Sequence, residues 1–405
     1  MSIFREIPPT AGFNIPLTDF LSAFTVKEGA LGKDFENYLG VDYAKVVNSG
    51  TAAFYLILES LKALSSRRTV IIPGFVCPLV PLAIARAGLK VKVCDIQENN
   101  FNYDYPALQE ICSKNNDILA IVAVHLAGIP LDFNQIEALC RKYGIFSVED
   151  CAQSLGARYK DRKTGALGDF SFFSLCRGKG LTIYEGGVAV TRHAEYKDIL
   201  NEKASILFKK APFAELIKII ELFGYAVFYR PYLFWWVFRL PELFWNLTGN
   251  KLKAHIEYFS ADFPIHSVSG FRKKIGHLGF KKLERELSAQ RDKAQYLKDS
   301  LRGLGSIVFV KEGAEDFVSY PYLSILIKDE NMRTPIEKYL SGLGLSRIYL
   351  FAISDYKYLE HIISEKDLPS ASYIAENSLT ISTSKFLNRR DLSRIIDKLK
   401  SLKGE

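Results

Sequence analysis

The sequence contains few cysteines, and none of them forms a metal-binding or disulfide motif. Six cysteines occur in 405 residues, all in the first half of the chain, and no pair has C-x-x-C spacing. Disulfide-rich domains and zinc sites place cysteines densely or at short fixed spacings. The six histidines also lack ligand spacing with cysteines or carboxylates. We therefore expect reduced thiols and no metal site.

The signatures of nucleic-acid binding and of export are also missing. The chain has 53 Lys and Arg against 45 Asp and Glu, a net charge of +8, but no compact basic run interleaved with aromatics. This balance favours anionic small molecules or acidic lipid surfaces as partners, and we expect no nucleic acid. The start, MSIFREIPPTAGF, lacks the long apolar core of a signal peptide. We therefore expect a cytoplasmic protein.

Apolar runs alternate with helical patterns from about residue 31 to 200. Four Val- and Ile-rich runs predict buried strands: RTVIIPGFV, LKVKVCDI, ILAIVAVHLAG and IFSVEDCAQ. Between them, VPLAIARAG and FNQIEALCRKYG predict helices that each end at a glycine. Strands and helices at this spacing predict an α/β fold with a mostly parallel central sheet and helices on both faces.

The pattern changes after this α/β region. We expect four parts: an N-terminal segment at 1–30, a large domain at 31–205, an aromatic-rich insert at 206–265, and a smaller C-terminal α+β domain at 266–405. The last part is predicted to open with one long charged helix, IGHLGFKKLERELSAQRDKAQYLKDSLRGLG.

The insert contains all three tryptophans of the chain within the segment 213–247. Its charge-free runs, 222–229 and 231–238, are shorter than the roughly 20 apolar residues of a membrane span. Aromatic rings with basic flanks are typical of a membrane interface, which would place the protein peripherally at the inner face of a membrane. A helical hairpin packed against the large domain or a dimer partner explains the pattern equally well.

The motif NSGTAAF joins a strand-like run to a predicted helix. Gly50 lets the backbone approach a ligand, and the amides of Thr51 and Ala52 at a helix N-terminus would form an anion site. The alternative is a plain N-cap made by Ser49 or Thr51, and the motif by itself favours that alternative.

The motif VEDCAQS places Asp150 at the carboxyl end of a buried strand, the edge at which open α/β sheets bind ligands. A carboxylate there needs a cationic partner, because burying an unpaired charge is costly. Asp150 could face a protonated ring nitrogen, with Gln153 bonded to the same ligand, or it could make a structural ion pair or cap a helix.

The motif FSLCRGKG offers Ser174 as a hydroxyl near an anion and places Lys179 between two glycines. A lysine amine held near other cations or away from water becomes a nucleophile, whereas a solvated lysine does not. Arg177 could steer an anionic substrate or only solvate the loop. His125 ends another predicted strand at the same sheet edge, where a ligand contact and a hydrogen-bonded core histidine are equally expected.

The order of these motifs indicates one cofactor. A phosphate-binding turn at Thr51 comes first, then Asp150 with Gln153, then Ser174 and Lys179 about 25 residues later. Pyridoxal 5′-phosphate needs a phosphate cradle, a partner for its pyridinium nitrogen and a lysine that forms a Schiff base. The set supplies all three, although each motif alone has a commoner explanation.

The chain resembles the DegT/StrS-type nucleotide-sugar aminotransferases, pyridoxal-phosphate enzymes of fold type I. The resemblance rests on the motifs KDFENYLG, NSGTAAF, VIIPGFVCPLVPLAIARAG, VCDI, AVHLAGIPLDF, VEDCAQSLGA, GALGDFSFFSLCRGKGL, EGGVAVT and LPSASYIAENSLTIS. It implies that 31–205 binds the cofactor, with Lys179 as the Schiff-base lysine, Asp150 opposite the pyridine nitrogen and Gln153 at the ring hydroxyl. The implied phosphate ligands are Thr51, Ala52 and Ser174. Cys77 stands where relatives often carry an aromatic residue that stacks on the ring.

The resemblance also implies an activity and partners. It implies transfer of an amino group from an amino acid, L-glutamate being expected, to a nucleotide-linked keto sugar in glycan biosynthesis, by a homodimer. Dehydratases of the family carry histidine in place of the lysine, so Lys179 favours transamination. A catalytically silent relative that acts as a membrane-associated or regulatory protein is the other alternative, although such a protein would not need Lys179, Asp150 and Gln153 together.

Overall fold

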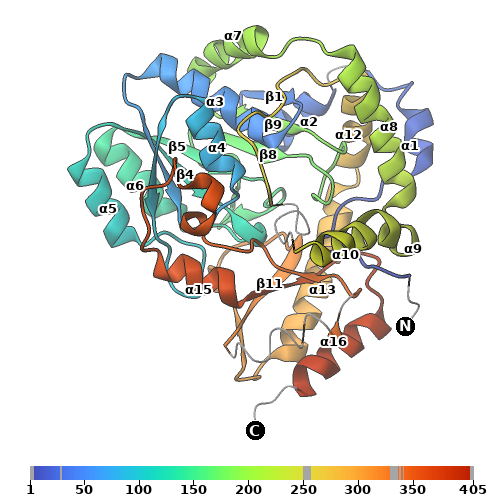
Figure 1. Ribbon diagram of the computed structural model, residues 1–405. Coiled ribbons are helices and arrows are strands. Elements are labelled where there is room, and N and C mark those ends of the chain that lie inside the picture. Colours follow the sequence, from blue (N-terminus) through green and yellow to red (C-terminus); the bar gives the residue numbers. More distant parts are fainter. Residues whose placement is uncertain are drawn as a thin grey trace.

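The computed structural model has a large α/β body and a smaller body built on a second sheet (Figure 1). It describes residues 4–27, 30–249, 257–328, 336, 339–340 and 342–401. Of the predicted parts, residues 250–256 of the insert and both ends of the chain lie outside the described residues.

Seven strands form the central sheet of the large body. Their order is β1 (Tyr43–Val47), β9 (Gly187–Thr191), β8 (Phe170–Ser174), β5 (Phe146–Asp150), β4 (Ile118–Val124), β2 (Thr69–Pro73) and β3 (Lys90–Cys94). The five strands from β8 to β3 are parallel, whereas β9 is antiparallel to both of its neighbours. The four predicted strands and the mostly parallel sheet are therefore confirmed.

Helices cover both faces of this sheet, as predicted. The alternating side chains of β4 explain why, because Val122 and Val124 join the core under one set of helices and Ile121 and Ala123 join the core under the other. The helices around the large sheet are α2 (Ala30–Leu39), α3 (Gly50–Leu64), α4 (Leu79–Arg86), α5 (Tyr105–Lys114), α6 (Phe133–Tyr143) and α7 (Lys197–Leu207). A short hairpin, β6 (Arg158–Tyr159) and β7 (Arg162–Lys163), precedes β8.

The smaller body confirms the predicted C-terminal α+β domain. Its antiparallel sheet has the order β10 (Ile307–Phe309), β11 (Tyr322–Ile327), β13 (Ser378–Ser382) and β12 (Leu345–Ser346). Its helices are α13 (Leu283–Leu301), α15 (Pro369–Asn377) and α16 (Arg389–Ser401), and Figure 1 shows α13 and α16 beside the sheet.

The prediction of one long helix at the start of this domain is wrong. The chain forms α12 (Gly270–Phe280) and then α13, with a break at Lys281 and Lys282. Gly276 of α12 lies against Leu31 of α2. The first turns of α13 join the same core cluster through Leu283 and Leu287, and α13 also packs along α16 of the smaller body.

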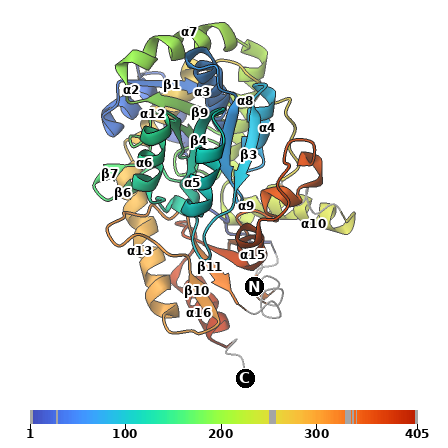
Figure 2. The same cartoon turned by 90° about the vertical axis from the view of Figure 1, so that its left-hand side faces the viewer.

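The insert forms a chain of helices along one side of the molecule. It consists of α8 (Pro212–Phe228), α9 (Pro231–Phe234), a π-helical turn (Trp235–Arg239) and α10 (Leu240–Leu247). Helix α8 lies beside α1 (Leu17–Ser22), and Figure 2 shows α10 projecting from the side of the molecule. As the sequence indicated, none of the described helices is long and apolar enough to cross a bilayer.

A buried ion pair fixes α8 to the large body. Arg272 of α12 is fully buried, and its Nε donates to a Glu215 carboxylate oxygen over 3.0 Å. Its Nη1 also donates to the carbonyl oxygen of Ile183 over 3.2 Å. Burial alone would raise the pKa of Glu215, but hydrogen bonds from Arg272 and Ser269 hold it below its ordinary value. The inner face of α8 therefore packs against the large body, as the helical-hairpin alternative for the insert expects.

Candidate active site

A cavity of about 500 Å³ lies at the carboxyl ends of β4, β5 and β8, beside the start of α3. Open α/β sheets bind ligands at this edge. The cavity wall includes the predicted site residues Gly50, Thr51, Cys77, His125, Asp150, Gln153, Ser174, Arg177 and Lys179. The structure thus brings together every predicted site residue except Ala52.

Asp150 is the last residue of β5 and is 5% exposed. One of its carboxylate oxygens, Oδ1, accepts the amide of Ala152 over 2.9 Å. Burial raises the pKa of Asp150 to about 6, and the Ala152 amide and the charge of Lys179 only partly offset that effect. Among the described residues, no cationic side chain lies within 4 Å of this carboxylate. The Asp150 carboxylate is therefore free to pair with a cationic group of a ligand.

Gln153 is held in one orientation by three hydrogen bonds. Its Oε1 accepts the amide of Ala127 over 3.0 Å and also accepts the hydroxyl of Tyr322. Its Nε2 donates to the hydroxyl of Tyr349 over 3.3 Å. Because the oxygen is used by protein donors and Nε2 carries two hydrogens, Gln153 can offer one N–H to a ligand in the cavity. The two tyrosines come from the smaller body, and the sequence analysis did not identify them.

Two alternatives were expected for NSGTAAF, an anion site and a plain N-cap, and the start of α3 has features of both. Ser49 is the N-cap, because its Oγ accepts the amide of Ala52 over 3.0 Å. The Ala52 amide therefore already has a partner, which a phosphate would have to displace, and its side chain is buried outside the cavity wall, so its role as a phosphate ligand stays a prediction. Thr51 lies in the first helical turn, where amides have no acceptor within the helix.

Gly50 allows a close approach between α3 and β8. A Cβ at this position would lie 2.9 Å from the Cβ of Ser174. Glycine therefore brings the Ser174 side chain next to the N-terminus of α3, where the helix dipole favours an anion. Thr51 and Ser174 thus lie at one end of the cavity, where a bound phosphate stays a prediction.

Lys179 lies on the loop between β8 and β9, which is tied to the N-terminal segment. Thr10 Oγ1 donates to the carbonyl oxygen of Gly178 over 2.6 Å, and the amide of Phe13 donates to the carbonyl oxygen of Lys179 over 3.3 Å. Gly178 has φ 77°, a left-handed conformation that favours glycine. The other neighbour, Gly180, has open space at its Cβ position. The backbone around Lys179 is thus held while its surroundings leave room for a bulky adduct.

His125 is the hydrogen-bonded core histidine of the two alternatives. It is 1% exposed; its Nδ1 accepts the amide of Leu131 over 3.2 Å, and its Nε2 lies 3.0 Å from Glu149. The Glu149 oxygens also accept three backbone amides of the loop before β8. Both His125 nitrogens are therefore used by the protein, and the ring can offer the cavity only apolar contact. His125, Glu149 and Cys151 cluster closely, but the N–H donors occupy the oxygens that a metal would need.

Cys77 and several aromatic residues complete the wall. Burial raises the pKa of Cys77 to about 12, so its thiol is neutral and acts as a small apolar group. The aromatic side chains that sequence analysis missed are Tyr258, Phe259, Phe263 and Tyr349. The first three lie in the last part of the predicted insert, after its helices, and Tyr349 belongs to the smaller body, so no local pattern links them to the strand-end motifs. Contact between Cys77 and the cofactor stays a prediction.

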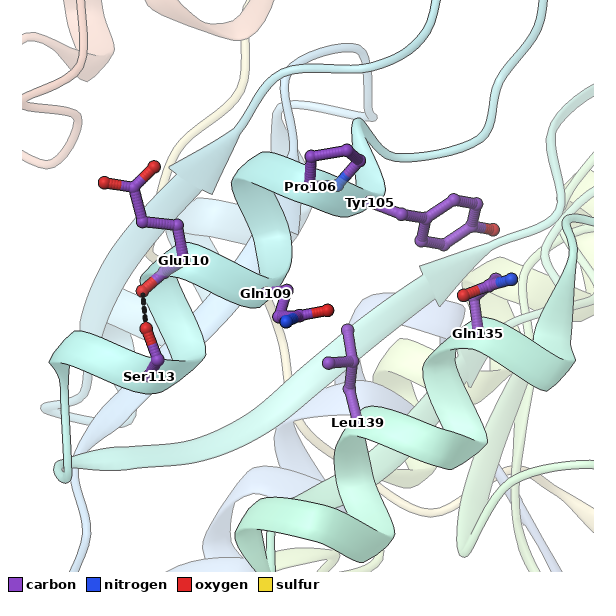
Figure 3. A pocket seen from close by; sticks show the side chains of 7 residues that line it. All are labelled: Tyr105, Pro106, Gln109, Glu110, Ser113, Gln135 and Leu139. Carbon is purple, nitrogen blue, oxygen red and sulfur yellow. Dashed lines mark hydrogen bonds between the residues drawn. The ribbon is translucent and has the colours of Figure 1, made fainter.

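A second hollow, between α5 and α6, lacks this chemistry (Figure 3). The side chains shown there are Tyr105, Pro106, Gln109, Glu110, Ser113, Gln135 and Leu139. Its carboxylate, Glu110, is exposed and paired with Lys114, and the Ser113 hydroxyl donates to the Glu110 carbonyl oxygen. No buried acid or nucleophile faces this hollow among the described residues.

The first cavity fits pyridoxal 5′-phosphate. The carboxylate of Asp150 suits a protonated ring nitrogen, the Gln153 amide can donate to a ring hydroxyl, and Lys179 can bond covalently to an aldehyde. Ser174 and the start of α3 suit the phosphate. The fit rests on the Asp150 carboxylate, which is buried and has no cationic partner in the described part of the chain. Without a cationic ligand, such a carboxylate only lowers the stability of the folded protein.

The fold of the chain matches those of solved sugar-modifying enzymes. It matches Helicobacter pylori PseC, an aminotransferase involved in pseudoaminic acid biosynthesis, with a TM-score of 0.76, 18% identity, and coverage of 98% of this chain and 99% of that one. It also matches Escherichia coli GDP-4-keto-6-deoxy-D-mannose-3-dehydratase with bound hydrated PLP, with a TM-score of 0.75, 19% identity, and coverage of 98% and 100%. The fold is thus that of pyridoxal-phosphate-dependent sugar aminotransferases and related dehydratases.

Sequence comparison points to one family. Residues 20–211, a little under half of the chain, match the model of the DegT/DnrJ/EryC1/StrS aminotransferase family. A Campylobacter jejuni UDP-4-amino-4,6-dideoxy-N-acetyl-beta-L-altrosamine transaminase is 35% identical over 163 residues, which are 39% of this chain and 42% of that protein. This similarity thus spans less than half of the relative's length. The family match ends one residue before α8 begins.

Proposed function

We propose that the protein is a pyridoxal 5′-phosphate-dependent aminotransferase that transfers an amino group from an amino acid, L-glutamate in the first instance, to a keto sugar. The match of residues 20–211 to the aminotransferase family model and the transaminase activity named for the Campylobacter relative support this proposal. The observation that carries it is the buried Asp150 carboxylate in the same cavity as Lys179.

Bound cofactor would supply an electron sink that stabilises negative charge at the carbon from which a proton is removed. Asp150 would keep the ring nitrogen protonated, and Gln153 would orient the ring through its free N–H. Ser174 and the Thr51 amide would hold the phosphate. The Lys179 amine, once free, is placed to take and return the proton as base and acid.

Lys179 also favours transamination over the two alternatives. The fold is shared with a dehydratase, so the fold does not decide between the reactions. A lysine can serve both as covalent anchor and as proton carrier. A silent relative would not need Asp150 in its costly buried position beside Lys179.

An absorbance experiment tests the proposed activity. Purified protein with added cofactor should be yellow, and L-glutamate should bleach the visible band as the amino group leaves the donor. Adding a nucleotide-linked keto sugar should restore the band. A protein that binds cofactor but shows no spectral response to any amino acid would favour the silent relative.

We also propose peripheral contact with an anionic membrane through the segment 213–247, at the inner face. The outer side chains of α8 and α10 support this, since Phe213, Ile220 and Leu247 are 76, 63 and 88% exposed. Several exposed apolar side chains in one segment are typical of an interface. Packing against a second copy in a homodimer is the other explanation.

Sedimentation with vesicles separates these explanations. Vesicles of phosphatidylglycerol should carry the protein down, and the double variant Phe213→Ser/Leu247→Ser should stay in solution. If the wild-type protein stays in solution at every vesicle concentration and is dimeric, the surface is a protein interface instead.

A further inference from the structure

A second cavity lies directly behind the loop that carries Lys179. It has a volume of about 590 Å³, within the range of roughly 300–1,000 Å³ that is typical of small-molecule pockets. One wall is the N-terminal segment and the loop itself, at Thr10 and Gly178. The opposite wall comes from the insert, with Phe228, Tyr229, Phe234, Val237 and Phe238. We call it the insert cavity.

The insert makes this cavity apolar. Two polar side chains in its wall already have partners: Glu221 pairs with Lys218 over 2.8 Å, and the Tyr229 hydroxyl donates to the carbonyl oxygen of Thr10 over 3.1 Å. The remaining surface consists mainly of rings and aliphatic side chains. The family match ends at residue 211, so the wall formed by α8 and the π-helical turn is additional to the matched domain.

Arg177 stands between the two cavities. It contributes to the walls of both the insert cavity and the cavity that contains Lys179. Its side chain is exposed, and no carboxylate lies within 4 Å of it among the described residues. The guanidinium instead lies 5.8 Å from the ring centroid of Tyr184. A guanidinium without a carboxylate partner is suited to a phosphate.

Tyr184 occupies an unusual backbone conformation at this junction. Its φ of 73° lies in the left-handed region, which is uncommon for an aromatic residue. Its ring lies near two cations, with the Arg177 Cζ 5.8 Å and the Lys218 Nζ 5.7 Å from the ring centroid. Backbone strain of this kind persists where the surrounding structure maintains it, often at ligand sites.

The mouth of the insert cavity joins the exposed apolar side of the insert. Phe228 and Val237 belong to the cavity wall and are also 40 and 50% exposed. An apolar path therefore runs from the outside of α8 and the π-helical turn through the insert cavity to Arg177. The order along this path is apolar surface, guanidinium and then Lys179.

We propose that the insert cavity binds the hydrocarbon chain of a lipid-phosphate-linked keto sugar, with the phosphate at Arg177 and the sugar at Lys179. This inference deepens and rests on the proposed function, because it names the acceptor of the same reaction. The sequence of chemical groups in such a substrate, hydrocarbon, phosphate and sugar, matches the sequence of groups along the path. A nucleotide-linked acceptor would not need an apolar cavity that opens toward a surface.

Binding of a simple amphiphile tests this inference without turnover. Decyl phosphate, used below its micelle-forming concentration, should bind the cofactor-loaded protein about tenfold or more tightly than inorganic phosphate, because two buried methylenes already provide that factor. The measurement is isothermal titration calorimetry. Arg177→Gln should weaken decyl phosphate about tenfold and leave the binding of decanol unchanged.

A matched pair of variants separates the cavity from the outer surface. Val237→Asp puts a charge into the cavity wall, and Leu247→Asp puts the same charge on an exposed apolar position of α10 outside the cavity. We expect Val237→Asp to lose decyl phosphate binding and Leu247→Asp to keep it. Circular dichroism should show that both variants are folded, as the exposure of the two positions predicts.

Two results would overturn the inference. One is decyl phosphate binding no more tightly than inorganic phosphate; the other is equal weakening in both aspartate variants, which would place the chain on the outer surface. The glutamate half-reaction is measured on the same samples. A normal half-reaction with no decyl phosphate binding rejects the lipid-linked acceptor alone, whereas decyl phosphate binding without a half-reaction rejects the aminotransferase.

Discussion

The amide of Phe13 donates a hydrogen bond to the carbonyl oxygen of Lys179 over 3.3 Å, and the carbonyl oxygen of Phe13 accepts the hydroxyl of Tyr225 over 2.9 Å. Tyr225 belongs to α8. The insert is therefore connected to the backbone of the candidate catalytic lysine through one residue of the N-terminal segment, which links the outermost helices of the chain to the chemistry of the site.

Removing the Tyr225 hydroxyl should loosen this connection. Tyr225→Phe keeps the buried ring but leaves the Phe13 carbonyl oxygen without this donor, so we expect a loss of about 1 kcal/mol in the free energy of unfolding and weaker cofactor binding. Urea denaturation and cofactor titration measure the two effects. Tyr232→Phe, at an exposed tyrosine of α9, is the control and should match the wild type. Equal cofactor affinity in both variants would show that the connection does not reach the site.

Gly12 should not tolerate a side chain. A Cβ there would lie 2.6 Å from the Tyr229 hydroxyl and 2.7 Å from the Gly178 Cα. Gly12→Ala should therefore cost about 1–3 kcal/mol of stability and displace the Lys179 loop. Thermal unfolding and cofactor occupancy measure the change. Gly305→Ala, where nothing lies near the Cβ position, should be nearly neutral, and an equally mild Gly12→Ala would contradict the packing described.

Asp150 should reduce the stability of the cofactor-free protein. Burial raises its pKa from 3.8 to about 6, so its contribution to stability is fully present below pH 4 and is lost as the pH rises through 6. Asp150→Asn keeps an acceptor for the Ala152 amide and removes the charge. We expect this variant, without cofactor, to gain up to about 3 kcal/mol over the wild type at pH 8.

The same substitution should weaken cofactor binding at pH 8, because the ring nitrogen loses its anionic partner. Urea unfolding across pH 4 to 8, with and without cofactor, measures both changes. A stability difference between wild type and variant that does not change with pH would contradict the role given to Asp150.

Breaking the buried ion pair under α8 should be costly. Arg272→Met leaves the buried Glu215 carboxylate without its partner, and we expect a loss of about 3–5 kcal/mol. The double variant Glu215→Leu/Arg272→Met removes both charges and should recover most of that loss. Denaturant unfolding of the three proteins measures this, and a double variant worse than the single one would show that the backbone contacts of Arg272 dominate.

Much of the site could be predicted because residues at strand ends can be recognised from the local sequence pattern. Asp150, Gln153 and Ser174 follow or end apolar runs, and parallel strands bring their carboxyl ends to one edge. The sequence could not decide whether His125 contacts a ligand or is a core histidine. Its partner is Glu149, and Glu149 is held in place by backbone amides of a later loop, which no sequence pattern indicates. Tyr322 and Tyr349 could not be predicted for a similar reason, since each is more than 160 residues away in sequence from Gln153, which it contacts.

The sequence distinguishes the insert as a segment, but it does not predict which of its side chains are buried. Its aromatic composition is compatible with core packing and with a surface, and helical periodicity alone does not say which side is covered. The structure places Tyr225 and Tyr229 inward, against the N-terminal segment, and leaves Phe213 and Ile220 outward. The break between α12 and α13 was missed because the apolar and charged pattern continues across Lys281 and Lys282, and neither residue is a glycine or proline that would mark an end.

The central claim is that Lys179 holds pyridoxal 5′-phosphate covalently and acts in transamination. Borohydride reduction of the cofactor-loaded protein, followed by peptide mass spectrometry, tests it most directly. We predict that the cofactor mass is found on the peptide that contains Lys179, that prior treatment with L-glutamate abolishes this labelling, and that Lys179→Ala is unlabelled. Label on another lysine, or labelling of Lys179→Ala at the wild-type level, would contradict the account.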